Sequence, residues 1–195
     1  AGVNAGNSIA SGGNYNVAIG DEAGTAITTG DQNVFVGYAS GDATTTASNN
    51  TAVGKSSLTV NTTGASNTAV GENALAANTT ASYNTAVGGA SLDANTTGAS
   101  NTGIGYSALG ANTTAADNTA VGYAALGLNT TGTQNVAVGY GALDANTTVH
   151  NNTAVGYASL GANTTGTQNT SVGSLALDAN TTASNNTAVG YLSLS

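Results

Sequence analysis

Few side chains in this sequence could carry out acid–base, nucleophilic or metal chemistry. The 195-residue chain has one histidine, His150, one basic residue, Lys55, nine acidic residues and no cysteine. A general base or nucleophile needs a partner in a cleft, and a thiolate or imidazole metal site needs several such ligands. We therefore expect no enzyme, no cofactor and no metal. Asp21, Glu22 and Asp31 come nearest to a calcium site, but they lack a ligand loop of recognisable spacing.

The tyrosines are the one chemically distinctive group that recurs at a fixed spacing. Four of them follow one another at a constant 17-residue interval, at Tyr106, Tyr123, Tyr140 and Tyr157. On neighbouring strands their rings would stack about 4.8 Å apart. Such a file suits a carbohydrate-binding stripe, or a ladder within the molecule or at a subunit interface. We favour the ladder and keep the carbohydrate stripe as the alternative.

Eight Asn-Thr-Thr triplets are formal N-glycosylation acceptors. They begin at Asn61, Asn78, Asn95, Asn112, Asn129, Asn146, Asn163 and Asn180. Because these asparagines recur at the same interval as the tyrosines, we interpret them as structural members of a stacked repeat.

The charge balance excludes several classes of partner. The formal net charge is −8, and a single lysine with no arginine cannot displace the counterions of a nucleic acid or attract an anionic membrane surface. No apolar run approaches the roughly 20 residues of a membrane span. We expect no nucleic-acid binding and no membrane insertion.

A strict repeat organises the chain. The pentad Asn-[Thr/Val]-x-[Val/Ile]-Gly begins at Asn16 and recurs with a 17-residue period as far as Asn186, eleven times in all. Numbered from this Asn, position 5 is always Gly, position 9 is Leu in nine units, and positions 13 and 14 are always Thr where present. The sequence therefore divides into an imperfect N-terminal coil, residues 1–15, and eleven 17-residue repeats, residues 16–195, the last one incomplete.

The repeat predicts an all-β protein, a parallel β-solenoid (β-roll or β-helix) of about eleven coils. A 17-residue unit is too short for a pair of helices, and its pentad alternates β-branched and small residues between Asn and Gly. We expect the pentad to form one strand, positions 7–9 a second and positions 12–14 a third.

Gap-free spacing places each residue on its equivalent in the next coil, so identical side chains form ladders. We expect buried apolar seams along positions 4 and 9 and polar ladders along position 1. The predicted ladder residues are Asn50, Asn67, Asn84, Asn101, Val53, Val70, Val87, Gly54, Gly71, Gly88, Leu75, Leu92 and Leu109.

A second, 34-residue period is superimposed on the first. Position 15 is Gly in odd units, such as Gly64 and Gly98, but Ala or Val in even ones, such as Ala81 and Val149. Either a 34-residue segment was duplicated, or alternate units meet different surroundings, for example on two sides of one long coil.

The repeat also predicts self-association. Position 3 faces away from position 4 and is mostly Ala, so we expect an outer strip of small residues that allows close approach of another copy. Bare terminal coils are templates for further pairing. The chain would then be a slice of a longer array, or a subunit that joins side by side or end to end.

The segment Asn-Thr-Ala-Val-Gly-Tyr-x-Ala-Leu resembles the head repeats of trimeric autotransporter adhesins, as do residues 7–12 and 16–20. The longer unit with Asn-Thr-Thr-Gly is similar to repeats of bacterial and phage tail-fibre-like surface proteins. The resemblance covers residues 16–195 and implies a left-handed parallel β-roll, three chains packed side by side, and a location outside the cell, on its surface or in a virion fibre. The 17-residue unit is longer than the usual adhesin-head repeat.

We therefore expect a structural extracellular fibre or adhesin segment, a self-associating homotrimer or filament, with a surface glycan or host receptor as a further partner. A carbohydrate-binding tail-fibre segment is one alternative. An ice-binding solenoid is another, because low charge and abundant Thr and Ala suit it. Against ice binding, Thr62 and Thr63 are adjacent and point to opposite sides of a strand.

Overall fold

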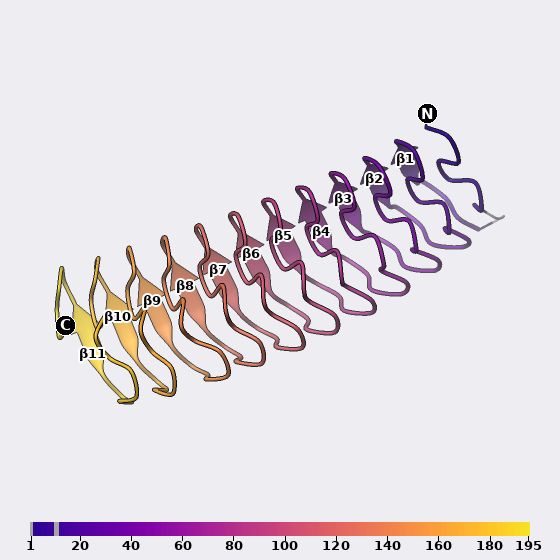
Figure 1. Cartoon of the computed structure of the whole chain (residues 1–195). Helices are drawn as coiled ribbons and strands as arrows, with labels where there is room; N and C mark the ends of the chain where they lie inside the picture. Colours follow the sequence, from indigo (N-terminus) through magenta and orange to yellow (C-terminus); the bar gives the residue numbers. More distant parts are fainter. Residues whose placement is uncertain (1, 10–11) are drawn as a thin grey trace.

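The computed structural model describes residues 2–9 and 12–195, and these form one straight stack of coils (Figure 1). Eleven strands lie in a single parallel sheet, in the order in which they occur in the sequence, and the described residues include no helix. The chain is a parallel β-solenoid, as the repeat predicts. The strands are β1 Val17–Ile19, β2 Val34–Val36, β3 Thr51–Val53, β4 Thr68–Val70, β5 Thr85–Val87, β6 Thr102–Ile104, β7 Thr119–Val121, β8 Val136–Val138, β9 Thr153–Val155, β10 Thr170–Val172 and β11 Thr187–Val189.

Each 17-residue unit makes one complete coil, which we number from coil 1 at Asn16. Strand pairing joins equivalent residues of successive units throughout, as in the Thr68–Thr85 and Val70–Val87 pairs between β4 and β5. Because every strand pairs only with its predecessor and its successor, a 34-residue coil with two different sides is wrong. At about 4.8 Å per coil, the eleven coils make a rod about 50 Å long.

Only one strand forms in each coil, and the predicted second and third strands are wrong. Positions 7, 9 and 17 adopt left-handed backbone, with φ between 47° and 64° in the non-glycine residues. Ala90, Leu92 and Ser100 are the examples in coil 5. An extended strand cannot pass through left-handed residues, so the chain turns at positions 7–9, and positions 12–14 form no strand either.

The Gly at position 5 turns the chain at the end of each strand. Gly88 has φ +133°, which L-residues with a side chain rarely adopt, and a Cβ placed on it would overlap the carbonyl of Gly105 in the next coil. Gly54 and Gly71 make the same contact with their successors. The Gly ladder therefore combines a backbone requirement with close approach between coils.

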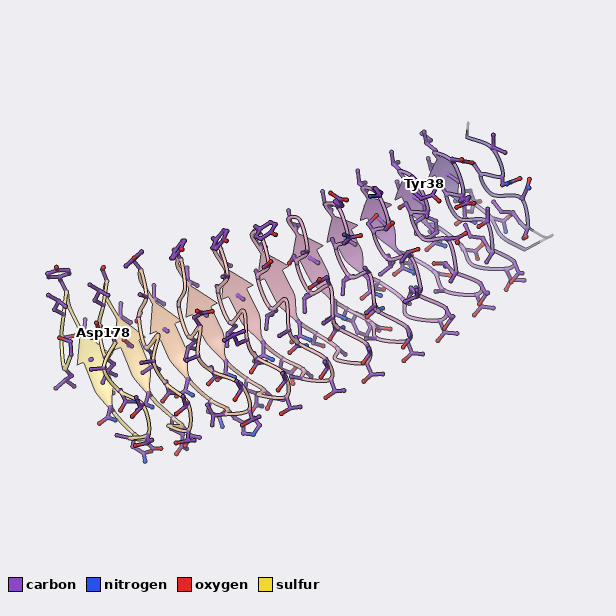
Figure 2. All side chains as sticks on the ribbon, in the orientation of Figure 1. Tyr38 and Asp178 are labelled. Carbon is purple, nitrogen blue, oxygen red and sulfur yellow. The ribbon has the colours of Figure 1, made fainter. Side chains whose placement is uncertain are left out.

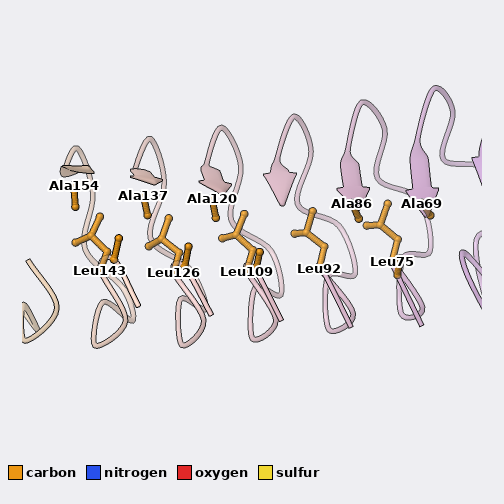
Figure 3. Close-up of a cluster of buried hydrophobic side chains, with 14 of the residues drawn as sticks. Ala69, Leu75, Ala86, Leu92, Leu109, Ala120, Leu126, Ala137, Leu143 and Ala154 are labelled. Carbon is orange, nitrogen blue, oxygen red and sulfur yellow. The ribbon is translucent and has the colours of Figure 1, made fainter. Parts of the chain in front are cut away.

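The core is a narrow column of small side chains and leucines. Position 3 points inward, so Ala69, Ala86 and Ala120 are fully buried, and Leu75 and Leu92 at position 9 pack beside them (Figure 3). The leucine recurs in every coil from Leu58 to Leu177, and alanine stands beside it in most of them, with Gly103 in coil 6 and Ser171 in coil 10, so the core is continuous.

Position 4 lies on the outer face of the sheet, so the predicted buried valine seam is wrong. Val53 is 36% exposed, and Val70 and Val87 are partly exposed in the same file. The predicted outer strip of alanines is wrong for the same reason, because alternation along a strand places position 3 inside when positions 2 and 4 are outside. The thin interior accommodates Ala from the strand because Leu already fills the remaining volume.

The first coils conserve this volume with different residues. Phe35 replaces the position-3 alanine of coil 2 and is fully buried. At position 9, where later coils have leucine, coil 1 has Gly24 and coil 2 has Gly41. A Cβ added to these glycines would lie 2.9 Å and 2.6 Å from the Phe35 ring. One large ring from the strand thus substitutes for leucines from the opposite side of the coil.

In coils 3 to 10, two asparagines share one carbonyl acceptor within the coil, and their side-chain amides link the coil to its neighbours. In coil 5 the Gly98 carbonyl accepts hydrogen bonds from Asn84 Nδ2 and Asn95 Nδ2, both at 2.9 Å. Asn84 Oδ1 accepts the backbone N–H of Asn101 in coil 6, also at 2.9 Å. Asn95 Nδ2 also donates to Asn78 Oδ1 in coil 4, at 3.1 Å. The two buried asparagines therefore satisfy backbone groups of their own coil and link it to both neighbours.

The 34-residue alternation appears at the residues around this carbonyl. In odd coil 3 the N–H groups of Thr62 and Thr63 both donate to the carbonyl of Thr79, at 2.8 and 3.4 Å. In even coil 4 Thr79 alone donates forward, to Thr96 at 3.1 Å. A Cβ on Gly64 would overlap the Ala81 carbonyl, so the odd coils require Gly at position 15. Alternate coils thus adopt two slightly different turns.

Residues 2–9 add turns in front of coil 1. The Gly6 N–H donates to the Ala23 carbonyl at 3.0 Å, and the Glu22 N–H donates to the Val3 carbonyl at 3.1 Å. Ala10 and Ser11, which belong to the segment that resembles adhesin heads, lie outside the described residues.

Replacing a single position-1 asparagine should destabilise the solenoid strongly. Asn84→Ala removes the acceptor of the Asn101 N–H and one donor to Gly98. We expect it to lower the free energy of unfolding by about 3 kcal/mol, because buried polar groups lose their partners. Urea unfolding followed by circular dichroism measures the change.

Thr80→Ala is the matched control, because Thr80 is exposed in the coil before Asn84. It should change the free energy of unfolding by less than about 0.5 kcal/mol. Equal stability of the two variants would show that the asparagine file does not hold the coils together.

Candidate functional surfaces

The tyrosine file lies at position 6, directly after the glycine that ends each strand. Figure 2 shows the side chains of all coils and labels Tyr38, the first tyrosine of this file. The ring centroids of Tyr106 and Tyr123 are 5.5 Å apart, those of Tyr123 and Tyr140 5.1 Å, and those of Tyr140 and Tyr157 5.5 Å. The interplanar angles are 7–18°, so the four rings form one parallel stack.

Stacking determines which parts of these rings a ligand could reach. Each ring is 50–56% exposed, but its faces lie against its neighbours, so the exposed part of an inner ring is its edge and hydroxyl. A sugar that packs on an aromatic face finds no free face at Tyr123 or Tyr140. The body of the stack is therefore a ladder, and only its two ends have a face without a tyrosine beside it.

The outer face of the sheet is a second regular surface. Positions 2 and 4 both point outward and carry Thr or Val and Val or Ile in every strand, with no charged residue. In strands β3 to β7 the pattern is Thr-x-Val or Thr-x-Ile without interruption. The surface combines hydroxyl and methyl groups in two straight files, spaced about 4.8 Å between coils and held by a hydrogen-bonded ladder.

The threonines of the Asn-Thr-Thr segments do not form a comparable array. At position 13 the Thr79 hydroxyl donates to the Thr96 carbonyl at 3.1 Å, and the Thr96 hydroxyl donates to the Thr113 carbonyl at 3.0 Å. The position-14 threonines, such as Thr80, lie on the surface. One file of each pair is thus bound to the backbone ladder.

Seven of the eight Asn-Thr-Thr asparagines are buried in the folded coil. These are Asn61, Asn78, Asn95, Asn112, Asn129, Asn146 and Asn163. The Asn78 amide uses both of its N–H groups, for Asn61 Oδ1 and the Ala81 carbonyl. In the folded rod these side chains are structural members of the polar ladder, and the sequence motif does not make them surface acceptors.

The charged side chains are few and scattered. Lys55 and Glu72 form an exposed ion pair of 3.1 Å at position 6 of coils 3 and 4. His150 accepts or shares hydrogen bonds with Thr133 at 2.9 and 3.0 Å on the surface. Among the described residues, no three His, Asp or Glu side chains form a group that could hold a metal ion, and this includes Asp21, Glu22 and Asp31.

Carboxylates at position 10 are partly withdrawn from water. Burial raises the pKa of Asp93 and Asp144 above the ordinary value for aspartate. Burial and the charge of Glu22 do the same to the pKa of Asp42, which accepts a hydrogen bond from the Thr25 hydroxyl. At the neighbouring turn, the hydrogen bond with Glu22 and the surrounding negative charge raise the pKa of Tyr38.

The part of the chain that the structure describes contains no pocket. It also contains no helix of the length and apolar character needed to cross a membrane. Comparison of the chain with protein-family models, with curated proteins and with solved structures finds no match.

The raised carboxylate pKa values predict that the rod becomes more stable as the solution is acidified. A group with a higher pKa in the folded state binds its proton more tightly when folded, so protonation favours folding. We expect the melting temperature to rise as the pH falls from about 7 towards the aspartate range near 4. Circular dichroism melts at a series of pH values measure this.

The double variant Asp93→Asn and Asp144→Asn separates these two carboxylates from the general decrease in net charge. At neutral pH it should melt higher than the parent, and the difference should disappear in acid, where both aspartates are protonated. A difference that is independent of pH would contradict the role of these carboxylates.

Proposed function

We propose that this chain is a rigid rod segment of an extracellular fibre or adhesin, whose role is to hold other parts at a fixed distance. The observation that carries the proposal is the uninterrupted register. The position-1 asparagine ladder runs from Asn16 to Asn186 without an insertion, each Oδ1 receiving the N–H of the next asparagine at 2.9–3.0 Å.

Such a ladder supports a mechanical role because bending the rod strains many bonds at once. In each coil the strand hydrogen bonds, the asparagine amides and the stacked leucines all span the same interval between coils. Loosening one interval leaves buried polar groups without partners. The rod also carries one lysine and no arginine, so trypsin-like proteases have a single cleavage residue, Lys55.

Self-association belongs to the same proposal, on a different surface from the one expected. The alanines of position 3 are inside the coil, so the outer face of the sheet, with Val53 and Ile104 about two-fifths exposed, is the flat uncharged surface on which another copy would pack. The resemblance to trimeric adhesin heads supports three chains side by side. The location outside the cell, and a glycan or receptor as partner, follow from that resemblance alone.

The length of the rod tests the spacer role. Duplicating residues 84–117 inserts two complete coils, and small-angle X-ray scattering should show the maximum dimension increasing by about 10 Å with an unchanged cross-section. The control inserts residues 84–116, one residue fewer. It places every later asparagine out of register, and it should unfold at lower urea concentration.

Two outcomes would contradict the proposal. An insertion that widens the particle instead of lengthening it would show that the coils do not add along one axis. A mass of one chain, 18.5 kDa, by light scattering at every concentration would rule out self-association and leave a monomeric rod.

Ice binding is a second candidate function, which the Thr-x-Val face supports. The objection from the adjacent Thr62 and Thr63 no longer decides the question, because a different pair of files, positions 2 and 4, forms the flat array. A rigid, uncharged lattice of hydroxyl and methyl groups suits ordered water. If this face binds ice, the purified chain should produce thermal hysteresis at micromolar concentration.

A pair of variants assigns such activity to its surface. Thr85→Lys with Thr119→Lys places two charges on the outer sheet face of coils 5 and 7, and should abolish the hysteresis. Thr97→Lys with Thr131→Lys places the same charges at position 14 of the same coils and should leave it unchanged. Absence of hysteresis in the parent chain would exclude ice binding.

A further inference from the structure

The threonine at position 13 links coils 4 and 6 to the coils that follow them, whereas coil 8 lacks this link. The Thr79 N–H donates to the Thr96 carbonyl and the Thr113 N–H donates to the Thr130 carbonyl, both at 3.1 Å. The hydroxyls of the same two threonines donate to the same carbonyls. Within the described coils, Thr147 of coil 8 donates neither group to coil 9.

The asparagine ladder at position 12 is interrupted at the same junction. Asn112 Oδ1 accepts a hydrogen bond from Asn129 Nδ2 at 3.0 Å, but the buried Asn146 Oδ1 has no hydrogen-bond partner in the part of the chain that the structure describes. Asn163 of coil 9 instead turns to its own coil, where its Oδ1 accepts the Gly166 N–H at 3.1 Å. Because a buried oxygen without a partner is costly, coils 8 and 9 are joined less tightly here.

A third file loses its bond at this junction. At position 17 the Asn151 N–H donates to the Thr133 carbonyl of the coil before it at 3.2 Å, and the Asn185 N–H donates to the Thr167 carbonyl at 3.1 Å. The Gln168 N–H of coil 9 makes no such bond to coil 8 among the described residues. Three files of the wall formed by positions 12–17, which we call the turn wall, are therefore unlinked between coils 8 and 9.

The exposure of the threonines at this junction agrees with the missing bonds. Thr147 and Thr164, on its two sides, are exposed. Thr113 and Thr130, which occupy the same positions two coils earlier, are only partly exposed. The turn wall is therefore more open to solvent between coils 8 and 9 than between coils 6 and 7.

The strand side of the same junction is intact. The Val136 N–H donates to the Asn152 carbonyl at 2.9 Å, and the Gly156 N–H donates to the Val138 carbonyl at 2.7 Å. The Asn152 N–H donates to Asn135 Oδ1 at 3.0 Å. Coils 8 and 9 are therefore connected along one wall and unconnected along the other, and the turn wall can separate while the strand ladder stays in place.

Each of the two turns is instead bound to the coil on its far side. In coil 8, His150 Nδ1 accepts the Thr133 N–H of coil 7 at 2.9 Å. In coil 9, the Thr164 N–H donates to the Thr181 carbonyl of coil 10 at 2.8 Å. Along the turn wall the rod thus consists of two bonded blocks, coils 1–8 and coils 9–11.

Val149 distinguishes coil 8 from the other even coils. It is buried at position 15, where coils 4, 6 and 10 carry Ala81, Ala115 and Ala183. A Cβ added at the same position in an odd coil, on Gly132, would meet the carbonyl of the next coil. Side-chain volume at position 15 therefore acts on the interval between coils, and two extra methyl groups in a packed interval push the neighbours apart.

We propose that the junction between coils 8 and 9 is a one-sided joint, at which the turn wall opens while the strand side stays closed, because Val149 holds the two turns apart. The strand ladder keeps the coil spacing, so opening tilts the two blocks without detaching them. The opening itself does not depend on the proposed rod function. Under a bending load, this junction is where the rod yields first.

Amide hydrogen exchange of the intact chain, followed by NMR, tests the joint. Thr147 and Thr113 each follow an asparagine, so their amides have the same chemical exchange rate in the absence of structure. We expect the Thr147 amide to exchange at least about tenfold faster. Gly156 and Gly122, which each follow a valine, report on the strand side, and their rates should agree within about threefold.

Two reciprocal variants test the role of the valine. Val149→Ala gives coil 8 the residue of the other even coils, and should slow exchange of the Thr147 amide to within about threefold of Thr113. Ala115→Val places the valine in coil 6, and should speed exchange of the Thr113 amide about tenfold by moving the joint to the junction of coils 6 and 7. Both variants should retain the parent's circular dichroism spectrum.

Three results would overturn the proposal. The first is equal exchange of the Thr147 and Thr113 amides in the parent chain. The second is fast exchange of Thr147 that Val149→Ala leaves unchanged, since the valine would then not be the cause. The third is fast exchange of Gly156 together with Thr147, which would show that the whole junction separates. None of these results changes the outcome of the scattering test of rod length.

Discussion

A single buried carbonyl group in each coil, that of position 15, is the point on which the rest of the structure depends. In coil 5 the Gly98 carbonyl accepts two amide hydrogens, from Asn84 and Asn95, and the oxygen of Asn84 then binds the backbone of coil 6. A buried polar group without a partner is costly, so both asparagines lie at fixed positions in coils 3 to 10, whereas the place of the second is taken by Ile27 in coil 1 and Thr44 in coil 2. An insertion or deletion of one residue breaks this arrangement, which is why the period of 17 is kept throughout.

The composition follows from that constraint. Each side chain lies on its own copy about 4.8 Å away, so a charged residue repeated in one file would repel itself, and the ten charged residues of the chain are dispersed. The turns between strands place residues in the left-handed region at three positions, which Gly and Asn adopt most readily and which Ser, Ala and Gln also occupy in this chain. Leucine accepts the same backbone at position 9 because its side chain is buried in the core.

The fold predictions that rest on the 17-residue repeat are confirmed. Those that rest on which residues of a strand point inward are wrong. The fold class, the 17-residue coil and the parallel register follow from the spacing of Asn and Gly. The direction of the strand residues did not follow, since a Thr-Ala-Val strand can face the core with either side. Larger apolar residues are usually inside, so Val70 was expected there, yet Ala69 is the buried residue. The position-9 leucines from the opposite wall leave room only for alanine, and this volume limit is visible only when the coil is closed.

What the sequence determined by itself is therefore the period, the parallel stacking and the identity of each ladder, because these depend on spacing along the chain. The tertiary structure decided which side of each strand faces water and that one strand and not three forms in each coil. The physical reason is that burial and left-handed turns depend on how the side chains from the two walls of a coil fill the space between them. The order of residues does not specify the width of that space.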